Sequence, residues 1–220
     1  MLIIEVNSYT FFLKNNLEVK NMSVNLQKGQ KVNLTKSDGS KLSKIMVGLG
    51  WDAVEQSGGF LSRVFGGKKD IDCDASVFLC KHGNLKESDD IVYYHNLEHR
   101  SGAVKHMGDN LTGEGEGDDE EIFVDLSKLP EEYDRLVFVV NIYQAVERKQ
   151  HFGMIKNAFI RIVDNETNTE LCRYNLSENY EGMYAMVVGE VYKKGDTWKF
   201  NAVGSGTKDT GLKDLSQRFV

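Results

Sequence analysis

Large apolar residues alternate with small or polar residues along most of the chain, which is the pattern of β-strands that bury one face. In segment 45–51, for example, Ile45, Val47, Leu49 and Trp51 occupy every second position. Many short runs of this kind, separated by turns, predict an all-β fold, a two-sheet β-sandwich. The other strand-like runs are 77–80, 91–94, 122–126, 136–143, 159–163, 171–176, 185–192 and 198–203.

Turn and helix signals are fewer. Gly195 and Asp196 stand between the last two strand-like runs and predict a hairpin there. Residues 144–156 contain a charged helical turn or two between strands. Leu212, Leu215 and Phe219 share one helical face near the end of the chain, so we expect a short C-terminal helix to dock on the core.

The length of 220 residues and the hydrophobic content of 40% fit one domain with a substantial core. Segment 57–69 has two Gly-Gly pairs around a short apolar stretch, which is typical of an inserted loop. The strand pattern becomes regular only after a second methionine, Met22. Residues 1–21 are therefore predicted to be an extension and residues 22–220 the single domain. Residues 17–22 could be encoded by a purine-rich ribosome-binding tract shortly before an ATG, so we hypothesise that the natural start is Met22. The intact mass of the protein from its native host tests this start, because a mass that includes residues 1–21 would contradict it.

The net charge of −6 comes from one segment, residues 109–121, and the remainder of the chain is nearly neutral. This segment contains no Lys or Arg. No basic stripe is present elsewhere, and the acidic segment repels phosphate, so the sequence excludes nucleic acid as a partner. The seven carboxylates of the segment are Asp109, Glu114, Glu116, Asp118, Asp119, Glu120 and Glu121.

The acidic segment also carries regularly spaced glycines, which let a backbone curl so that its oxygen atoms converge. Ca²⁺ takes six to eight hard oxygen ligands in a flexible cage. Thiolates and imidazoles are nearly absent here, which disfavours zinc and copper. The alternative is a disordered acidic linker, but strand-like runs flank the segment on both sides. The pattern therefore favours calcium binding.

A second acidic element precedes it. Asp70, Asp72 and Asp74 share one face of a predicted strand, together with Ser76. Close carboxylate pairs repel by about 1 kcal/mol in water and about 4 kcal/mol at an effective dielectric of ~20, so such a row indicates a bound cation. A solvated strand edge is the alternative. An EF-hand is excluded, because that loop needs Gly where Ala75 stands and Glu at the position of Lys81.

Two other patterns, the H-x-x-E-H letters and the cysteines, do not indicate a metal site. His95–His99 matches the letters H-x-x-E-H of a zinc-peptidase class, but that chemistry needs a helix and this segment follows a strand-like run, so we interpret the match as a coincidence in a surface loop. The cysteines number three and lack metal-ligand spacing, which predicts buried free thiols in a reducing compartment. Cys73 and Cys80 are expected on opposite faces of one strand.

Nothing in the sequence predicts a membrane span. No apolar run approaches the ~20 residues that a span needs, and the first residues lack the basic region of a signal peptide. The protein is expected in the cytoplasm, without direct membrane insertion.

With these residues in view, the chain resembles the TerD family of tellurite-resistance and stress-response proteins. The matching stretches follow the family order over nearly all of residues 22–220. They are GLGWD (48–52), DIDCDAS (70–76), GDNLTGEGEGDDEEI (108–122), VVNIYQA (139–145), QHFGMIKNAFIRIVD (150–164), LCRYNLSE (171–178), AMVVGEVY (185–192) and DTWKFNAVGSG (196–206).

The resemblance implies a two-sheet sandwich that binds calcium near one end, commonly at two adjacent sites. Asp52 and Asp70 are further candidates for ligands, and Glu116 belongs to the same acidic loop. The sequence departs from the family at His95, where Asn is frequent, and in the longer insert at 57–69. The ligands carried over by position are Asp72, Asp74, Asn96, Asp109, Asn110, Glu114, Asp118, Asp119 and Glu120.

The family likeness implies a non-enzymatic protein without catalytic residues. Ca²⁺ would order the 108–121 loop against the Asp70–Asp74 strand, and the ordered end would dock other proteins of a tellurite-resistance or stress complex, including membrane-associated ones. The alternative function is a metal-dependent phosphoester hydrolase that holds two metal ions in the carboxylate cluster. It needs a basic group for substrate, and nothing in the sequence ties Lys105 or His106 to the site. Phosphatase and nucleotidase assays with Mg²⁺ or Mn²⁺ separate the two hypotheses.

Overall fold

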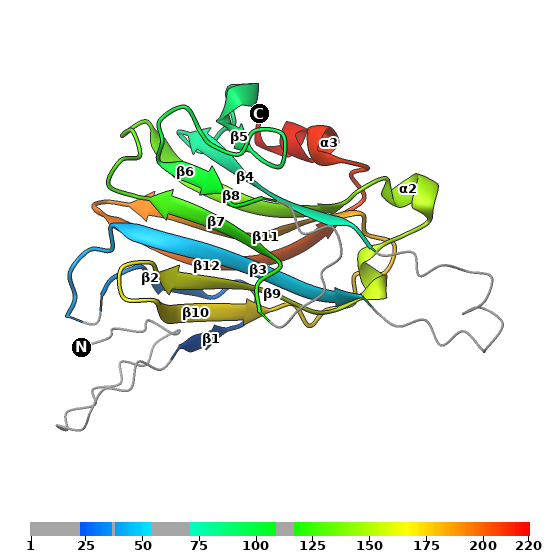
Figure 1. The fold of residues 1–220 in the computed structure, drawn as a ribbon, viewed down its shortest axis with the longest axis horizontal. Helices are drawn as coiled ribbons and strands as arrows, with labels where there is room; N and C mark the ends of the chain where they lie inside the picture. The colour runs from blue at the N-terminus through cyan, green and yellow to red at the C-terminus, as the bar shows by residue number, and fades with distance from the viewer. Residues whose placement is uncertain (1–22, 37, 54–70, 109–116) are drawn as a thin grey trace.

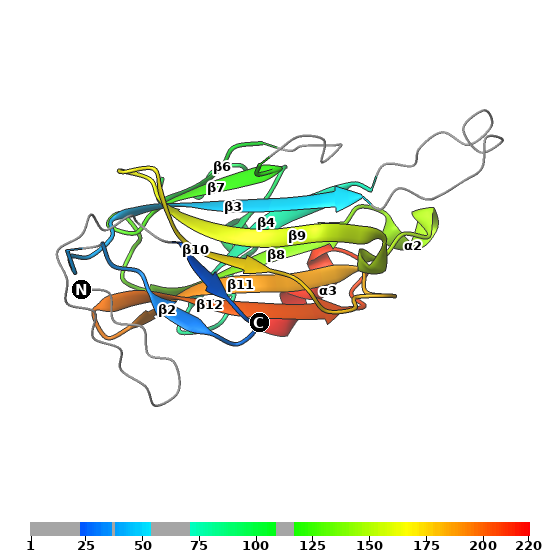
Figure 2. The same cartoon turned by 90° about the horizontal axis from the view of Figure 1, so that it is seen from below.

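The fold is a sandwich of two sheets that pack face to face (Figures 1 and 2). It comes from a computed structural model that describes residues 23–36, 38–53, 71–108 and 117–220. The first sheet has the strand order β1 (Val24–Leu26), β10 (Thr169–Asn175), β9 (Ile155–Asp164), β3 (Lys44–Ala53), β7 (Glu120–Asp125) and β6 (Val104–His106). The second sheet has the order β2 (Lys31–Asn33), β12 (Thr197–Thr207), β11 (Ala185–Lys194), β8 (Tyr133–Ile142), β4 (Cys73–Lys81) and β5 (Ile91–Val92). The predicted two-sheet β-sandwich is confirmed.

The main core lies between the sheets and follows the alternation of the sequence. Ile45, Val47, Leu49 and Trp51 of β3 all face this core, as predicted. Neighbouring strands are antiparallel, apart from the parallel pair β1–β10. The hairpin predicted at Gly195 joins β11 to β12.

A smaller core covers the outer face of the second sheet. Helices α3 (Leu212–Ser216) and η3 (Gln217–Phe219) lie on β4 and β8 (Figure 1). Phe78 and Cys80 of β4 pack here with Leu215, and the rings of Phe78 and Phe219 meet edge to face at 5.5 Å. Cys73 faces the main core instead. The C-terminal helix and the opposite orientations of Cys73 and Cys80 are therefore as predicted, and all three cysteines are buried and free.

Several element boundaries differ from the prediction. The strand predicted over 91–94 ends at Val92, because Tyr93 and Asn96 exchange backbone hydrogen bonds of 3.0 and 2.8 Å across a tight turn. The helical segment predicted over 144–156 is divided into α2 (Ala145–Arg148) and η2 (Phe152–Met154). Lys149 ends α2 with a left-handed φ of 54°. The predicted extension at 1–21 and insert at 57–69 lie outside the described residues.

The H-x-x-E-H letters do not form a helix. His99 is buried, where its Nε2 lies 3.3 Å from Asp90 Oδ1, and Ser101 N donates to its Nδ1. His95 is exposed and its ring packs against Tyr94. The two imidazoles therefore have different surroundings, as expected of a chance match.

None of the described helices is long and apolar enough to cross a membrane.

Candidate metal site

Four of the predicted ligands gather at one end of the sandwich, around the buried thiol of Cys73. Asp72 immediately precedes β4 and Asp74 is its second residue, while Asp119 immediately precedes β7 of the other sheet and Glu120 is its first residue. Burial raises the pKa of Cys73 well above its ordinary value, and the negative charges of Asp74, Glu120, Asp72 and Asp119 raise it further. The two acidic elements of the sequence therefore meet in space.

The two sheets are joined at this point by Glu120 and His106. β5 pairs with β4 only at Val77 and Phe78. Before those residues, Ala75 N donates to Glu120 Oε2 at 2.7 Å, and Ala75 O lies 3.2 Å from His106 Nε2. The edge of β4 is thus bound by side chains that come from β6 and β7.

The tautomer of His106 follows from its neighbours. Gly108 N donates to His106 Nδ1 at 3.1 Å, so a neutral ring carries its proton on Nε2. This Nε2 lies 3.2 Å from Glu120 Oε2 as well as from Ala75 O. His106 therefore holds the Glu120 carboxylate in place, a role that the sequence did not indicate.

Asp72 and Asp74 each have a partner on β8 or on α2, the helix that follows β8. Arg148 Nη1 of α2 lies 3.5 Å from Asp72 Oδ2. Asn141 of β8 stands opposite Asp74, and its Nδ2 donates to Asp74 Oδ2 at 3.3 Å. Asn141 was not among the predicted ligands; the signal that could have identified it is a polar residue inside the apolar run of β8.

Asp119 is fixed by the backbone of β3. Trp51 N donates to Asp119 Oδ2 at 2.6 Å, and Asp119 N donates to Leu49 O at 2.8 Å. Burial raises the pKa of Asp119; the hydrogen bond from Trp51 opposes this shift, whereas the charges of Asp52 and Asp118 add to it. The ionised carboxylate is therefore held in surroundings that disfavour its charge, as expected of a group that meets a cation.

Asp118 points elsewhere, over the outer face of the first sheet. Arg161 of β9 donates to it from Nε at 2.8 Å and from Nη2 at 2.7 Å, and this ion pair raises the pKa of Arg161. The carboxylate lies over Gly48 of β3, where an added Cβ would stand 2.2 Å from Asp118 Oδ2. The first glycine of the GLGWD motif is thus explained by close approach of the acidic loop.

The remaining predicted ligands are separated or lie outside the described residues. Asp52 is exposed and accepts a hydrogen bond of 2.7 Å from Asn157 Nδ2. Asn96 lies in the turn after β5 and donates from Nδ2 to Ile91 O at 2.7 Å. The predicted ligands outside the described residues are Asp70, Asp109, Asn110, Glu114 and Glu116.

The donors at this end fit a hard cation, although they do not complete a site. Within the described ranges, no group of three or more His, Cys, Asp or Glu side chains is arranged to hold an ion. The side chains that gather here are carboxylates and one amide, and their oxygens are of the kind that suits Ca²⁺ or Mg²⁺ better than zinc or copper. Asp72, Asp74, Asp119 and Glu120 are the described residues that would hold such an ion, and further donors must come from elsewhere.

Gly48→Ala is expected to destabilise the protein by about 1–3 kcal/mol, because the new methyl group displaces the Asp118 carboxylate and strains its pairing with Arg161. Urea denaturation of the two single variants and the double variant Gly48→Ala/Asp118→Ala measures the coupling. Alanine at 118 removes the clash, so Gly48→Ala should cost less in that background. An equal cost in both backgrounds would contradict the assigned contact.

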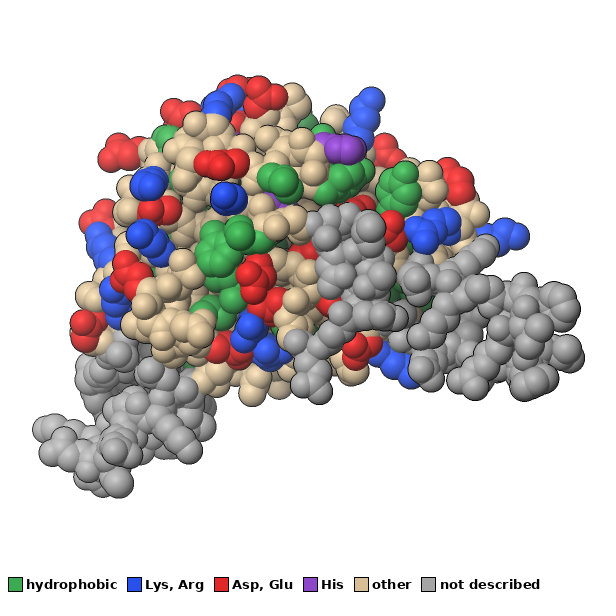
Figure 3. Space-filling model, in the orientation of Figure 1, with side chains coloured by type: hydrophobic (Ala, Val, Ile, Leu, Met, Phe, Trp, Pro, Cys, Tyr) green, Lys and Arg blue, Asp and Glu red, His purple; other side chains and the backbone are tan. Residues whose placement is uncertain are grey.

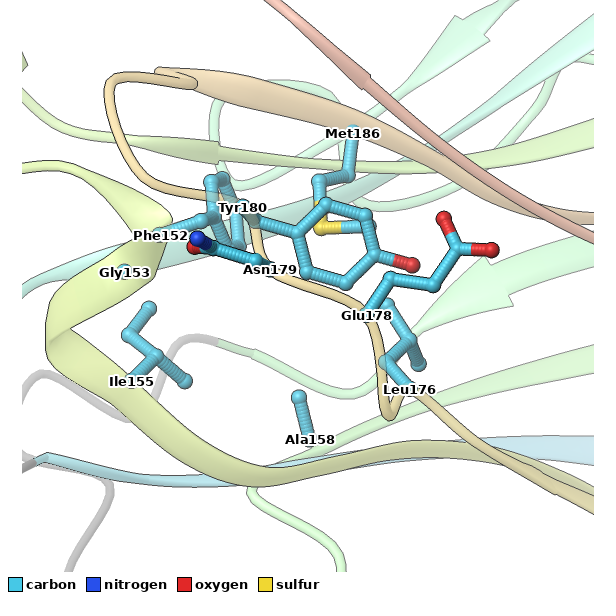
Figure 4. A pocket seen from close by; sticks show the side chains of 9 residues that line it. All are labelled: Phe152, Gly153, Ile155, Ala158, Leu176, Glu178, Asn179, Tyr180 and Met186. Atoms are coloured by element: carbon cyan, nitrogen blue, oxygen red, sulfur yellow. The ribbon is translucent and has the colours of Figure 1, made fainter.

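A cavity of about 110 Å³ opens nearby and is chemically unlike the carboxylate cluster. Figure 4 shows Ile155 and Ala158 of β9 on one side, with Tyr180 and Met186 on the other. Its polar groups already have partners: Tyr180 Oη donates to Gly204 O at 3.2 Å, and Glu178 pairs with Lys28. The cavity therefore presents both polar and apolar surface, and none of the clustered carboxylates lines it.

The comparisons with known proteins agree with the fold. A family model described as the TerD domain matches residues 22–219. The stress response protein SCP2 of Bacillus subtilis (strain 168) is 52% identical over 90% of this chain and 100% of its own length. The tellurium resistance protein TerD of Serratia marcescens is 43% identical over 84% of this chain and 91% of its own length. A solved structure, described as a homologue of telluride resistance protein (TerD) from Streptomyces coelicolor A3(2), superposes with a TM-score of 0.60 at 18% identity. It covers 81% of this chain and 98% of its own, and it shows the fold alone.

Proposed function

The chain belongs to the TerD domain family, and from this premise we propose that it is a calcium-binding, non-enzymatic protein of tellurium resistance or general stress response. The relatives' names support the resistance and stress role. The observation that supports calcium is the meeting of Asp72, Asp74, Asp119 and Glu120 from two different sheets around one buried thiol.

In the proposed mechanism the carboxylates at this end of the sandwich repel one another, and Ca²⁺ relieves the repulsion by supplying positive charge. Glu120 is held by Ala75 and His106, and Asp119 by Trp51, so both enter the site already oriented. The acidic loop at 108–121 ends at these anchored residues and begins at Gly108, whose N–H donates to His106 Nδ1. Binding is therefore proposed to fix the loop against β4, with two ions as the expected number.

Ca²⁺ at 1 mM is expected to raise the melting temperature of the full chain by roughly 5–10 °C relative to the protein in EDTA. Saturation at about 100 times the dissociation constant stabilises the folded state by ~2.7 kcal/mol. In a protein of this size, each kcal/mol shifts the midpoint by about 2–4 °C. Differential scanning calorimetry with and without Ca²⁺ measures the shift.

Two controls accompany this measurement. Mg²⁺ at the same concentration tests whether the effect is merely screening of the acidic loop, since Mg²⁺ demands stricter geometry and dehydrates reluctantly. Addition of excess EDTA to the calcium-loaded sample should return the midpoint to its starting value. An unchanged midpoint in 1 mM Ca²⁺ would refute the calcium-binding function.

We place the partner surface at the same end of the molecule and the protein in the cytoplasm. Exposed apolar side chains next to the carboxylates support a docking role, since Met107 follows β6 directly and Tyr143 N donates to Asp72 O. On the face shown in Figure 3, Lys and Arg side chains are interspersed with Asp and Glu, which supports a protein partner over nucleic acid. The proposed partners are other proteins of a tellurite-resistance or stress complex, membrane-associated ones included.

A metal-dependent phosphoester hydrolase is the alternative, and Arg148 beside Asp72 is the observation in its favour, because such an enzyme needs a cation for the phosphate. His106 is less suited to act as a base, since its Nε2 proton already faces Glu120 and Ala75. Turnover of a phosphoester with Mg²⁺ or Mn²⁺ that disappears in Asp74→Asn would establish the enzyme and displace the binding function.

A further inference from the structure

A buried polar group lies on the outer face of the second sheet, directly beside the carboxylate cluster. Asp74 of β4 stands opposite Asn141 of β8, and Ser76 is next on the same face of β4. The three residues are 5%, 7% and 1% exposed. Further along this face the residues are apolar, such as Phe78 and Val139, and they pack in the smaller core under α3 and η3. Asp74, Ser76 and Asn141 thus lie where this face approaches the acidic end.

Two oxygen atoms of this group lack a hydrogen-bond partner among the described residues: Asn141 Oδ1 and Ser76 Oγ. Buried polar atoms almost always have a partner, because leaving one without compensation is unfavourable. The amide of Asn141 is meanwhile oriented by its other atom, since Nδ2 donates to Asp74 Oδ2. An orientation that satisfies Nδ2 therefore leaves a carbonyl oxygen uncompensated next to a buried carboxylate.

A cation that prefers oxygen ligands would compensate these two buried oxygen atoms, which apolar packing does not. Amide carbonyls and hydroxyls are ligands that calcium accepts alongside carboxylates, and they raise the coordination number without adding charge repulsion. Mg²⁺ usually keeps several of its water ligands, so an additional neutral oxygen donor from the protein contributes less to its binding. A neutral oxygen donor at this place would therefore strengthen Ca²⁺ more than Mg²⁺.

We propose that Asn141 belongs to the metal site: its Nδ2 orients Asp74, and its Oδ1 is a neutral oxygen ligand that favours Ca²⁺ over Mg²⁺. This inference rests on the proposed calcium-binding function and adds to it a residue from β8, a strand that carries none of the ligands expected from the sequence. Ser76 Oγ is the next oxygen on the same face and serves as a supporting donor.

The test is Asn141→Leu in the full chain, which keeps the volume and removes both polar atoms. Titration calorimetry should show Ca²⁺ binding weakened by about tenfold or more, as for other supporting groups of metal sites, with a smaller loss for Mg²⁺. The melting temperature in EDTA should change little, because removal of the uncompensated Asn141 Oδ1 offsets the loss of the Nδ2 hydrogen bond to Asp74. A merely structural role predicts instead a lower melting temperature in EDTA together with unchanged Ca²⁺ affinity.

Asn201→Leu is the matched control, because Asn201 also has an uncompensated Oδ1 and donates from Nδ2 to a carboxylate, that of Glu190. Asn201 lies on β12, two strands away from β8. Its Ca²⁺ affinity should equal that of the wild type. If Asn141→Leu does not fold, Asn141→Val is measured in the same way, with the same expectation. Wild-type binding together with unweakened binding in the variant would overturn the role of Asn141 alone, whereas no binding by the wild type would overturn the calcium function as well.

Discussion

Asp90→Ala is expected to lower the free energy of unfolding by about 3 kcal/mol, because it removes the anion from a buried ionic cluster. Asp90 is 0% exposed. Its Oδ1 accepts from Tyr133 Oη at 2.7 Å and from Arg100 Nη2 at 2.9 Å, while Lys81 Nζ lies 3.7 Å from Oδ2. These contacts bind η1 (Ser88–Asp90) to the end of β4, to the start of β8 and to the turn before β6. The expected loss lies at the low end for buried pairs, since Glu87 still pairs with both cations.

Urea denaturation measures this loss, and the neighbouring residue supplies the control. Asp89 is exposed and adjacent, so Asp89→Ala changes the same charge without entering the cluster. It should alter the free energy of unfolding by no more than about 0.5 kcal/mol. Equal effects of the two substitutions would mean that the Asp90 cluster does not stabilise the fold.

Strands with several alternating positions could be predicted because their periodicity is a local property. β3 contains enough residues to show which of its faces is apolar. β1, β2 and β6 have three residues each, which is too short for an alternation to be recognised. Those strands form because a neighbouring strand offers a free edge, and a free edge is a property of the assembled sheet.

The same distinction separates the predicted and the unforeseen parts of the site. Carboxylate rows are visible in the sequence, so Asp72, Asp74, Asp119 and Glu120 could be named in advance. Asn141 could not, because its relation to Asp74 depends on the pairing of β4 with β8. The ion pair of Asp118 with Arg161 could not be predicted either, because it depends on the register between β3 and β9, whereas the prediction of Asp118 as a ligand stays a prediction.

Asp119 is the carboxylate from which the largest effect on metal binding is expected. Burial raises its pKa from an ordinary value of 3.8, so its ionised form destabilises the metal-free fold. This destabilisation is complete at pH values above the raised pKa of the folded state. It vanishes at pH values below the pKa of the unfolded state, because the carboxyl is then protonated in both states. Asp119→Asn should therefore be as stable as the wild type, or more stable, in EDTA at pH 7, and this advantage should disappear as the pH falls below 3.8.

In calcium the order is expected to reverse. Asp119→Asn retains an oxygen that can accept from Trp51 N, so the geometry at β3 persists while one negative charge is lost. Because ligand charge sets calcium affinity, titration calorimetry should show binding weakened by about tenfold or more, and most of the calcium-induced rise in melting temperature should be lost. Asp89→Asn, a change of the same kind at an exposed residue away from the carboxylates of the proposed site, should leave both quantities unchanged. Wild-type affinity in Asp119→Asn would exclude Asp119 as a ligand. A variant that is instead less stable in EDTA would show that its carboxylate holds the fold together, rather than awaiting a cation.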